Sequence, residues 1–297
     1  ISVSKDINIA KLENKGNVVT AKNLNIYGSL TNSGNIQAIE NQVEKIVLVD
    51  NSTENFLEKT ELVNLLLQDS RLVYIDNKGN LGIAKALNQI MSYAFDKEYE
   101  WVLTLDQDTI CPQNLVENYK QYLGVPDVGI ICPKIKDRNF EFINNDSGKT
   151  DFVKYCITSA ALTSTLIWKK IGGFSDELFI DYVDFDYCLN LKKNNYRILR
   201  VNTVEILHEI GHAKTYHILG KTILTFNHPP IRNYYIVRNK LVCAYKYKNL
   251  VNVRKEKKEI FTHVLKVIFL ENNKLQNIKC LCKGIEDGIR MISEMRL

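Results

Sequence analysis

From residue 43 the chain alternates short apolar runs with longer helical ones, and this alternation constrains the fold more than any other feature. The apolar runs, each of a length typical of a strand, are 43–50, 71–76, 100–106 and 128–135, and the helical runs between them include 55–68 and 83–96. Strands that are apolar throughout and separated by helices are typical of a parallel sheet with helices on both faces. The sequence therefore predicts an α/β fold with a mostly parallel sheet covered on both sides.

Polar side chains gather where the predicted strands end. Asp50 and Asn51 follow the first strand, Asp76 and Asn77 follow the second, and Asp106 ends the third. Ligands of such sheets bind in the crevice beyond the carboxyl ends of the strands. We therefore expect one edge of the sheet to form a polar binding site.

The sequence LDQDT places Asp106 and Asp108 one residue apart at this edge. Two carboxylates so close repel each other, and a divalent cation between them relieves the repulsion because hard cations prefer carboxylate oxygens. Mg²⁺ and Mn²⁺ both suit such a site and bring substrate phosphates with them. The alternative is a pair of surface-loop acids, since short DxD strings are common by chance.

A second acidic stretch, DYVDFDYC, supplies Asp181, Asp184 and Asp186 at the start of a predicted helix. Acids there are stabilised by the helix dipole, which is a sufficient structural explanation for one of them. Asp184 and Asp186 cannot both be caps, however. A carboxylate beside an apolar wall can act as a general base near neutral pH, and this is the functional interpretation of the stretch.

Two further features border the predicted edge. Gly79 and Gly82 precede a helix in NKGNLG, where glycine lets the backbone approach a ligand and the helix N-terminus favours an anion. This loop is neither a Walker loop nor a dinucleotide fingerprint, and a turn with a helix cap explains it as well. His208 ends a short apolar strand, where it is either a structural residue or a metal ligand.

Composition excludes several classes of protein. The net charge of +5 is too small to indicate nucleic-acid binding. Seven cysteines without a CxxC pair argue against a structural zinc site and are typical of a reducing, cytoplasmic compartment. We find no signal peptide and no apolar run near the ~20 residues that a membrane span needs.

Residues 1–37 differ in character from the rest of the chain. LENKGN at Leu12 returns as LTNSGN at Leu30, in a segment rich in Asn, Gly, Ser and Thr. Short strands with Asn-Gly turns at such a period predict rungs of a β-solenoid, and the segment resembles the repeats of filamentous-haemagglutinin-type adhesins. A polar, partly ordered leader is the alternative.

Along the chain the motifs occur in the order VDN, NKGNLG, LDQDT, TSAAL, GGF, DYVDFDYC and LHEIG. This series resembles the inverting family 2 glycosyltransferases with the GT-A fold, over about residues 38–290. HPPIRNYYIVRN (228–239) and KGIEDGIR (283–290) resemble their rhamnosyltransferase-like branch. The resemblance implies metal-dependent transfer of a sugar, favouring L-rhamnose from dTDP-rhamnose, with UDP-sugars as the alternative. The acceptor would be a saccharide or lipid-linked saccharide in cell-envelope polysaccharide synthesis.

The resemblance also implies roles for individual residues. Asp184 would be the base that deprotonates the acceptor hydroxyl. The residues that would bind the nucleotide-sugar donor are Asp50, Asn51, Asn80, Gly82, Lys85, Asp106 and Arg232. The metal, Mg²⁺ or Mn²⁺, would be held by Asp108, Asp106 and His208. Arg238 is a further candidate, with Arg232, for contact with the leaving diphosphate or an anionic acceptor.

One part of the family pattern is missing. Members open with a strand that ends at the nucleotide base, and the residues before 43 contain no such strand. The first strand is therefore either absent or replaced, with GNVVTA (16–21) the best candidate for a substitute. An unpaired inner edge would impair the enzyme and leave at most a binding or surface protein. A nucleotidyltransferase would need a glycine-rich basic loop, which the sequence lacks.

The pattern predicts three regions: an Asn/Gly-rich leader (1–37), a GT-A domain (38–245) and a basic amphipathic helical extension (246–297). In the extension, basic residues lie beside an apolar stripe that includes Ile260 and Phe269. This suits an anionic membrane surface, although packing against the catalytic domain explains it as well. We expect a cytoplasmic protein in peripheral contact with the inner face of the membrane.

Overall fold

The computed structural model describes residues 17–19, 25–26, 43–51, 70–105, 111–112, 114–137, 148–208, 214–218 and 221–295. The helix predicted at 55–68 lies outside these residues. So do Asp106 and Asp108 and most of the predicted solenoid.

The first sheet is built around strand β3 (Lys45–Asp50), whose neighbour β4 (Leu72–Asp76) is parallel to it. The opposite edge of β3 is covered by two short strands. Strand β1 (Asn17–Val19) pairs antiparallel with its second half, and β2 (Asn25–Ile26) pairs parallel with its first two residues. The structure thus contains a substitute strand within 16–21, and the described part of the leader pairs with β3.

The second sheet has the order β5-β8-β6-β9-β7. Its strands are β5 (Trp101–Thr104), β6 (Val128–Asp137), β7 (Thr150–Val153), β8 (Ala161–Ser164) and β9 (Arg197–His208). Strands β5, β6 and β9 of this sheet run in one direction, as predicted, whereas β7 and β8 run opposite to them, a direction that the sequence did not predict. The reason is that an apolar run reports burial on both faces and carries no information on strand direction.

Helices cover both faces of this sheet, as predicted, and alternate side chains along each strand separate into two cores. Val102 and Ile130 pack with helices α3 (Ile83–Asp96), α5 (Thr165–Ile171) and α6 (Val183–Lys193). Their neighbours Leu103 and Ile131 pack on the other face with α4 (Leu115–Lys120). Burial on both faces explains why these strands are apolar throughout.

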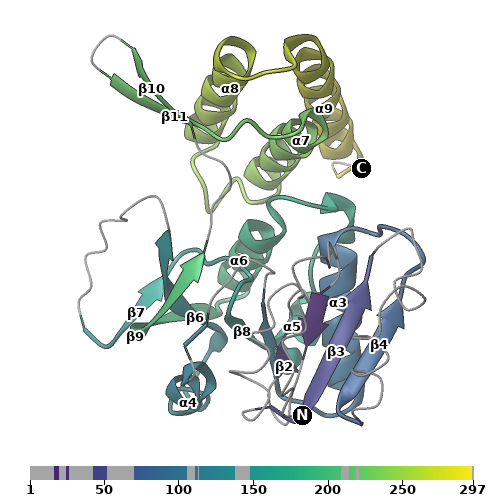
Figure 1. Ribbon diagram of the computed structural model, residues 1–297, viewed down its shortest axis with the longest axis vertical. Coiled ribbons are helices and arrows are strands. Elements are labelled where there is room, and N and C mark those ends of the chain that lie inside the picture. Colours follow the sequence, from purple (N-terminus) through teal and green to yellow (C-terminus); the bar gives the residue numbers. More distant parts are fainter. Residues whose placement is uncertain are drawn as a thin grey trace, which may run out of the picture.

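The C-terminal part adds a hairpin and three helices, which Figure 1 shows together at one end of the molecule, with α6 between the helices and the sheets. They are β10 (Lys214–Ile218), β11 (Lys221–Thr225), α7 (Pro230–Lys246), α8 (Val253–Leu270) and α9 (Lys274–Glu294). In the described part of the chain, none of the helices combines the length and apolar character that crossing a bilayer requires.

The motif KGIEDGIR forms the contact between α9 and α7. A Cβ atom added to Gly284 would lie 2.5 Å from the carbonyl oxygen of Tyr234, so only glycine allows this close approach. The hydroxyl of Tyr234 donates a hydrogen bond to Asp287 Oδ2 at 2.9 Å. Val242 and Cys243 on α7 also belong to the core of α3, α5 and α6, so α7 joins α9 to the rest of the molecule.

Candidate active site

The polar ends of β3 and β4 are tied together and to the loop before α3. Asp50 is 1% exposed and accepts a hydrogen bond from the Tyr74 hydroxyl at 2.7 Å. Burial, followed by the hydrogen bond and charge of Asp50, raises the pKa of Tyr74, so its hydroxyl stays a donor. Asn51 donates to the carbonyl oxygen of Gly82 at 3.2 Å and accepts from Asn77 at 2.7 Å.

The loop before α3 turns tightly at Gly82, which has a φ of 86°. Asn80 stabilises the turn because its Oδ1 accepts from the Gly82 amide at 3.0 Å. A Cβ atom on Gly82 would lie 2.6 Å from the ring of Phe179, so the loop is in direct contact with the segment before α6. Lys85, on the first turn of α3, forms an exposed ion pair with Asp176 at 3.0 Å.

The acids at the start of α6 lie in different environments. Asp186 is 1% exposed, and Lys246 Nζ on α7 approaches its two oxygens at 2.9 and 3.1 Å. The hydroxyl of Ser175 donates to the same carboxylate at 2.6 Å. Asp186 therefore serves an internal ion pair and is closed off from a substrate.

Asp184, by contrast, is partly exposed and lines a small pocket with Phe174, Tyr187 and Thr158. Its Oδ1 accepts a hydrogen bond from the amide of the next residue in α6 at 2.8 Å. The pocket adjoins the end of β5, because the Thr104 hydroxyl donates to the carbonyl oxygen of Thr158. The structure therefore brings Asp184 near the strand from which the DxD acids continue.

The two arginines that the sequence suggested for diphosphate contact differ in position. Arg232 lies on the first turn of α7, and its side chain is 44% exposed. Its Nε and Nη2 donate hydrogen bonds to the carboxylate oxygens of Asp181 at 3.0–3.2 Å. Burial raises the pKa of Asp181, and Arg232 partly offsets this effect. Arg238 is 8% exposed and donates to the carbonyl oxygens of Glu177 and Leu178, so the prediction that it contacts the diphosphate is wrong.

The side chains of the three predicted metal ligands lie outside the part of the chain that the structure describes. Asp106 and Asp108 follow β5 outside it, and β9 ends at His208, whose side chain is not described. Within the described residues no group of three or more His, Cys, Asp or Glu side chains could hold a metal ion. The donor set itself fits, because carboxylate oxygens suit Mg²⁺ and Mn²⁺ and imidazole is accepted by Mn²⁺.

Some residues of the site could not be recognised from the sequence. Tyr74 lies within a strand, and Lys246 lies in the last turn of a long helix, where a basic residue needs no special explanation. Asn239 is fully buried and belongs to the motif at 228–239, so the motif was the only signal for it.

Solved structures define the class of the fold. The structure is similar to TarS 1–349 from S. aureus in complex with UDP-GlcNAc, with a TM-score of 0.53 and 13% identity, over 91% of this chain and 80% of that one. It is also similar to GalNAc-T7 solved with UDP, GalNAc and Mn²⁺, with a TM-score of 0.57 and 11% identity, over 91% of this chain and 56% of that one. The fold is that of the GT-A glycosyltransferases.

Sequence comparison defines the family. Residues 30–216 match Glycosyl transferase family 2, and the chain belongs to this family. The chain is 28% identical to the dTDP-rhamnosyl transferase RfbF of Shigella flexneri, over 91% of this chain and 97% of that protein. It is also 28% identical to the poly-beta-1,6-N-acetyl-D-glucosamine synthase of Staphylococcus aureus, over 55% of this chain and 42% of that protein.

Proposed function

We propose that this chain transfers L-rhamnose from dTDP-rhamnose, with inversion, to a saccharide or lipid-linked saccharide during cell-envelope polysaccharide synthesis. The observation that carries the catalytic part is that Asp184 and Asp186, both in the first turn of α6, lie in different environments. Asp186 is paired with Lys246 in the interior, whereas Asp184 faces a pocket beside the end of β5. The similarity to RfbF along nearly the whole of both chains supports the choice of sugar.

The proposed reaction is a single displacement. The acceptor oxygen attacks the anomeric carbon on the face opposite the nucleotide, and Asp184 takes the hydroxyl proton. The bond from the anomeric carbon to the diphosphate breaks, and the diphosphate leaves with the electron pair. Because no covalent intermediate forms with the protein, the configuration at the anomeric carbon inverts.

The donor would lie along the polar edge between β3 and α3. Residues there that we propose as donor contacts are Asp50, Asn51, Asn80, Gly82 and Lys85, together with Asp106 and Arg232. Asp108, with Asp106 and His208, would hold Mg²⁺ or Mn²⁺. When bound, such a cation stabilises the negative charge of the leaving diphosphate.

A panel of sugar nucleotides tests the donor. With MnCl₂ and an acceptor saccharide, we expect dTDP to be released from dTDP-rhamnose at least tenfold faster than UDP from UDP-GlcNAc. We also expect the release to stop with EDTA and to return with Mn²⁺ or Mg²⁺. Coupled detection of the nucleoside diphosphate measures both. Protein that releases no diphosphate from any donor in the panel would refute the enzymatic proposal for this chain.

We further propose that α8 contacts an anionic membrane surface from the cytoplasmic side. Phe261, Leu265 and Phe269 are 62%, 38% and 68% exposed and lie on one side of α8. Arg254, Lys257 and Lys258 continue the same side toward the start of the helix, and all three are exposed. Exposed apolar rings beside basic residues suit the interface of a bilayer with anionic lipids.

Vesicle sedimentation tests this contact. We expect the protein to bind vesicles of phosphatidylglycerol and phosphatidylcholine, and to bind pure phosphatidylcholine much less. Replacing Phe261 and Phe269 together with Ser should weaken binding by at least tenfold, because two inserted rings are lost. Leu166→Ser is the matched control, since Leu166 is 68% exposed on α5, and it should leave binding unchanged. Equal binding by all variants would contradict the proposed surface.

A further inference from the structure

The segment that leads into α6, residues 176–182, here called the strap, has an unfavourable backbone. Phe179, Asp181 and Tyr182 have φ values of 64°, 61° and 65°, although none is glycine. At Phe179 the Ile180 amide donates to the Leu178 carbonyl at 2.8 Å, which makes a γ-turn of the rare, strained kind. Such a backbone persists only where the surrounding structure holds it in place.

Two neighbouring side chains of α7 hold the strap. The Asn239 side-chain nitrogen lies 2.9, 2.7 and 2.8 Å from the carbonyl oxygens of Leu178, Ile180 and Asp181. Because the amide has only two hydrogens, three carbonyls share them. Arg238 Nη2 donates to the carbonyls of Glu177 and Leu178 at 2.7 and 3.0 Å.

Arg238 also fixes the orientation of Asn239. Its Nε donates to Asn239 Oδ1 at 2.8 Å, which directs the amide nitrogen toward the strap. The guanidinium carbon lies 4.8 Å from the centre of the Tyr235 ring, and that ring stacks on Phe179 at 5.1 Å. Arg238 is 8% exposed and Asn239 0%, so water does not compete for these bonds.

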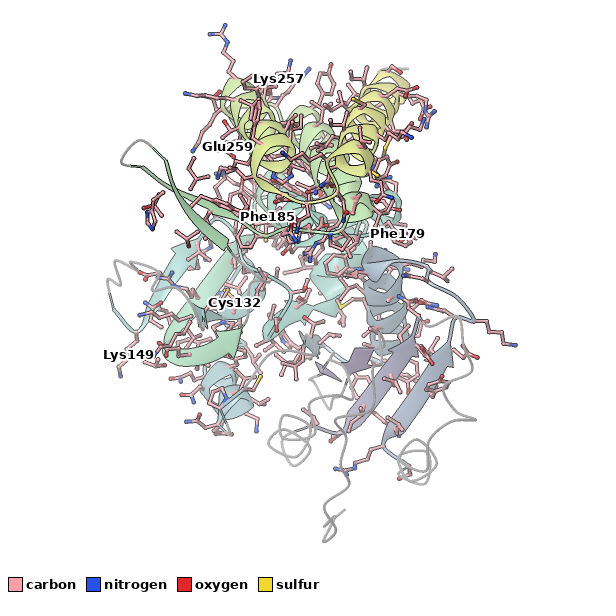
Figure 2. The ribbon with its side chains drawn as sticks, turned by 45° about the horizontal axis from the view of Figure 1, so that its top comes forward. Cys132, Lys149, Phe179, Phe185, Lys257 and Glu259 are labelled. Carbon is pink, nitrogen blue, oxygen red and sulfur yellow. The ribbon has the colours of Figure 1, made fainter. Side chains whose placement is uncertain are left out.

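The strap in turn contacts both halves of the proposed site. On the donor side, the Phe179 carbonyl accepts from the Ile83 amide at 2.6 Å, directly after Gly82. On the other side, Tyr182 is the N-cap residue of α6, whose first turn carries Asp184. Figure 2 shows Phe179 where α3 meets the C-terminal helices.

We propose that Arg238 and Asn239 are positioning residues that set the placement of Asp184 relative to the donor loop at Asn80–Gly82. Neither residue touches the reacting atoms, and both act through the strap. This inference rests on the proposed function of Asp184. Helix α9 supports α7 at these positions, because Gly284 and Gly288 pack directly on the backbone of α7 at Tyr234 and Arg238.

The test compares the same substitution at two asparagines of α7. Asn239→Asp places a carboxylate oxygen against the three strap carbonyls. Asn233→Asp is the matched control, since Asn233 is also 0% exposed but donates to Glu271 and Asn277, neither of which belongs to the strap. We expect kcat to fall about 100-fold for Asn239→Asp, as for a small misplacement of a reacting group, with the donor KM changed less than threefold. The control should keep kcat within threefold of wild type.

Hydrogen exchange supplies a readout that needs no substrate. Amides of residues 177–184 should exchange at least tenfold faster in Asn239→Asp than in wild type or Asn233→Asp. Arg238→Lys, which keeps the charge but loses the planar fork, should show the same two changes to a smaller degree and carries the comparison if Asn239→Asp does not fold. Unchanged kcat in an active enzyme, or equal loss in both asparagine variants, would overturn the inference. An inactive wild type whose strap exchanges as expected would instead refute the proposed function.

Discussion

Asp184→Asn should lower the rate of sugar transfer by about 10²–10⁴-fold, the usual contribution of a positioned general base. The amide keeps the size of the side chain and its acceptor oxygen, which can still receive the hydrogen bond from the Phe185 amide. We therefore expect the fold and the affinity for the donor to change little. Transfer rates with labelled acceptor, together with calorimetric donor binding, measure the two effects separately.

Asp186→Asn is the matched control for this prediction. It leaves the Lys246 ammonium without its carboxylate, and breaking a buried pair of this kind costs about 3 kcal/mol. The variant should therefore unfold at lower temperature yet retain most of its transfer rate well below that temperature. The assignment of the base would be wrong if Asp184→Asn kept a tenth of the wild-type rate, or if it lost donor binding.

Gly82→Ala should have the second-largest effect. The φ of 86° disfavours any side chain, and the added Cβ atom would lie 2.6–2.9 Å from the ring and backbone of Phe179. Strain and overpacking together should lower the free energy of unfolding by about 2–5 kcal/mol. Since the strap must move away from the donor loop, kcat/KM should also fall by about 100-fold. Denaturant unfolding and steady-state kinetics measure these changes.

Gly79→Ala provides the comparison within the same loop. A Cβ atom on Gly79 would meet nothing within 4 Å, and its backbone is not in the left-handed region. We expect a change of less than about 0.5 kcal/mol in stability and no change in kinetics. Equal effects of the two substitutions would show that the loop is not held against the strap.

The alternation of apolar and helical runs predicted β3, β4, β5, β6 and α3 to within a few residues, because burial on both faces leaves a plain pattern. It could not predict the direction of β8, since a strand buried on both faces has the same composition in either direction. Strand β7 is partly exposed and was not among the predicted strands. The replacement of the first strand by β1 and β2 was only one of two alternatives, because three-residue and two-residue strands carry little signal.

The candidate site shows a similar limit. The sequence placed Asp184 and Asp186 equally at the start of a helix, and what distinguishes them is a lysine 60 residues beyond Asp186. Likewise, the guanidinium of Arg238 is of the kind that binds anions, but its partners are backbone carbonyls 60 and 61 residues earlier in the chain. Contacts between residues so far apart are set by the packing of α7 on the strap, which no local pattern records.

The anomeric configuration of the product tests the central claim most directly. Transfer by a single displacement, with Asp184 as base, predicts that the sugar in the product has the opposite configuration to the sugar in the donor. Nuclear magnetic resonance of the isolated product, through the one-bond carbon–hydrogen coupling at the anomeric position, distinguishes the two configurations. A product of inverted configuration is the predicted result, and a product of retained configuration would contradict the mechanism.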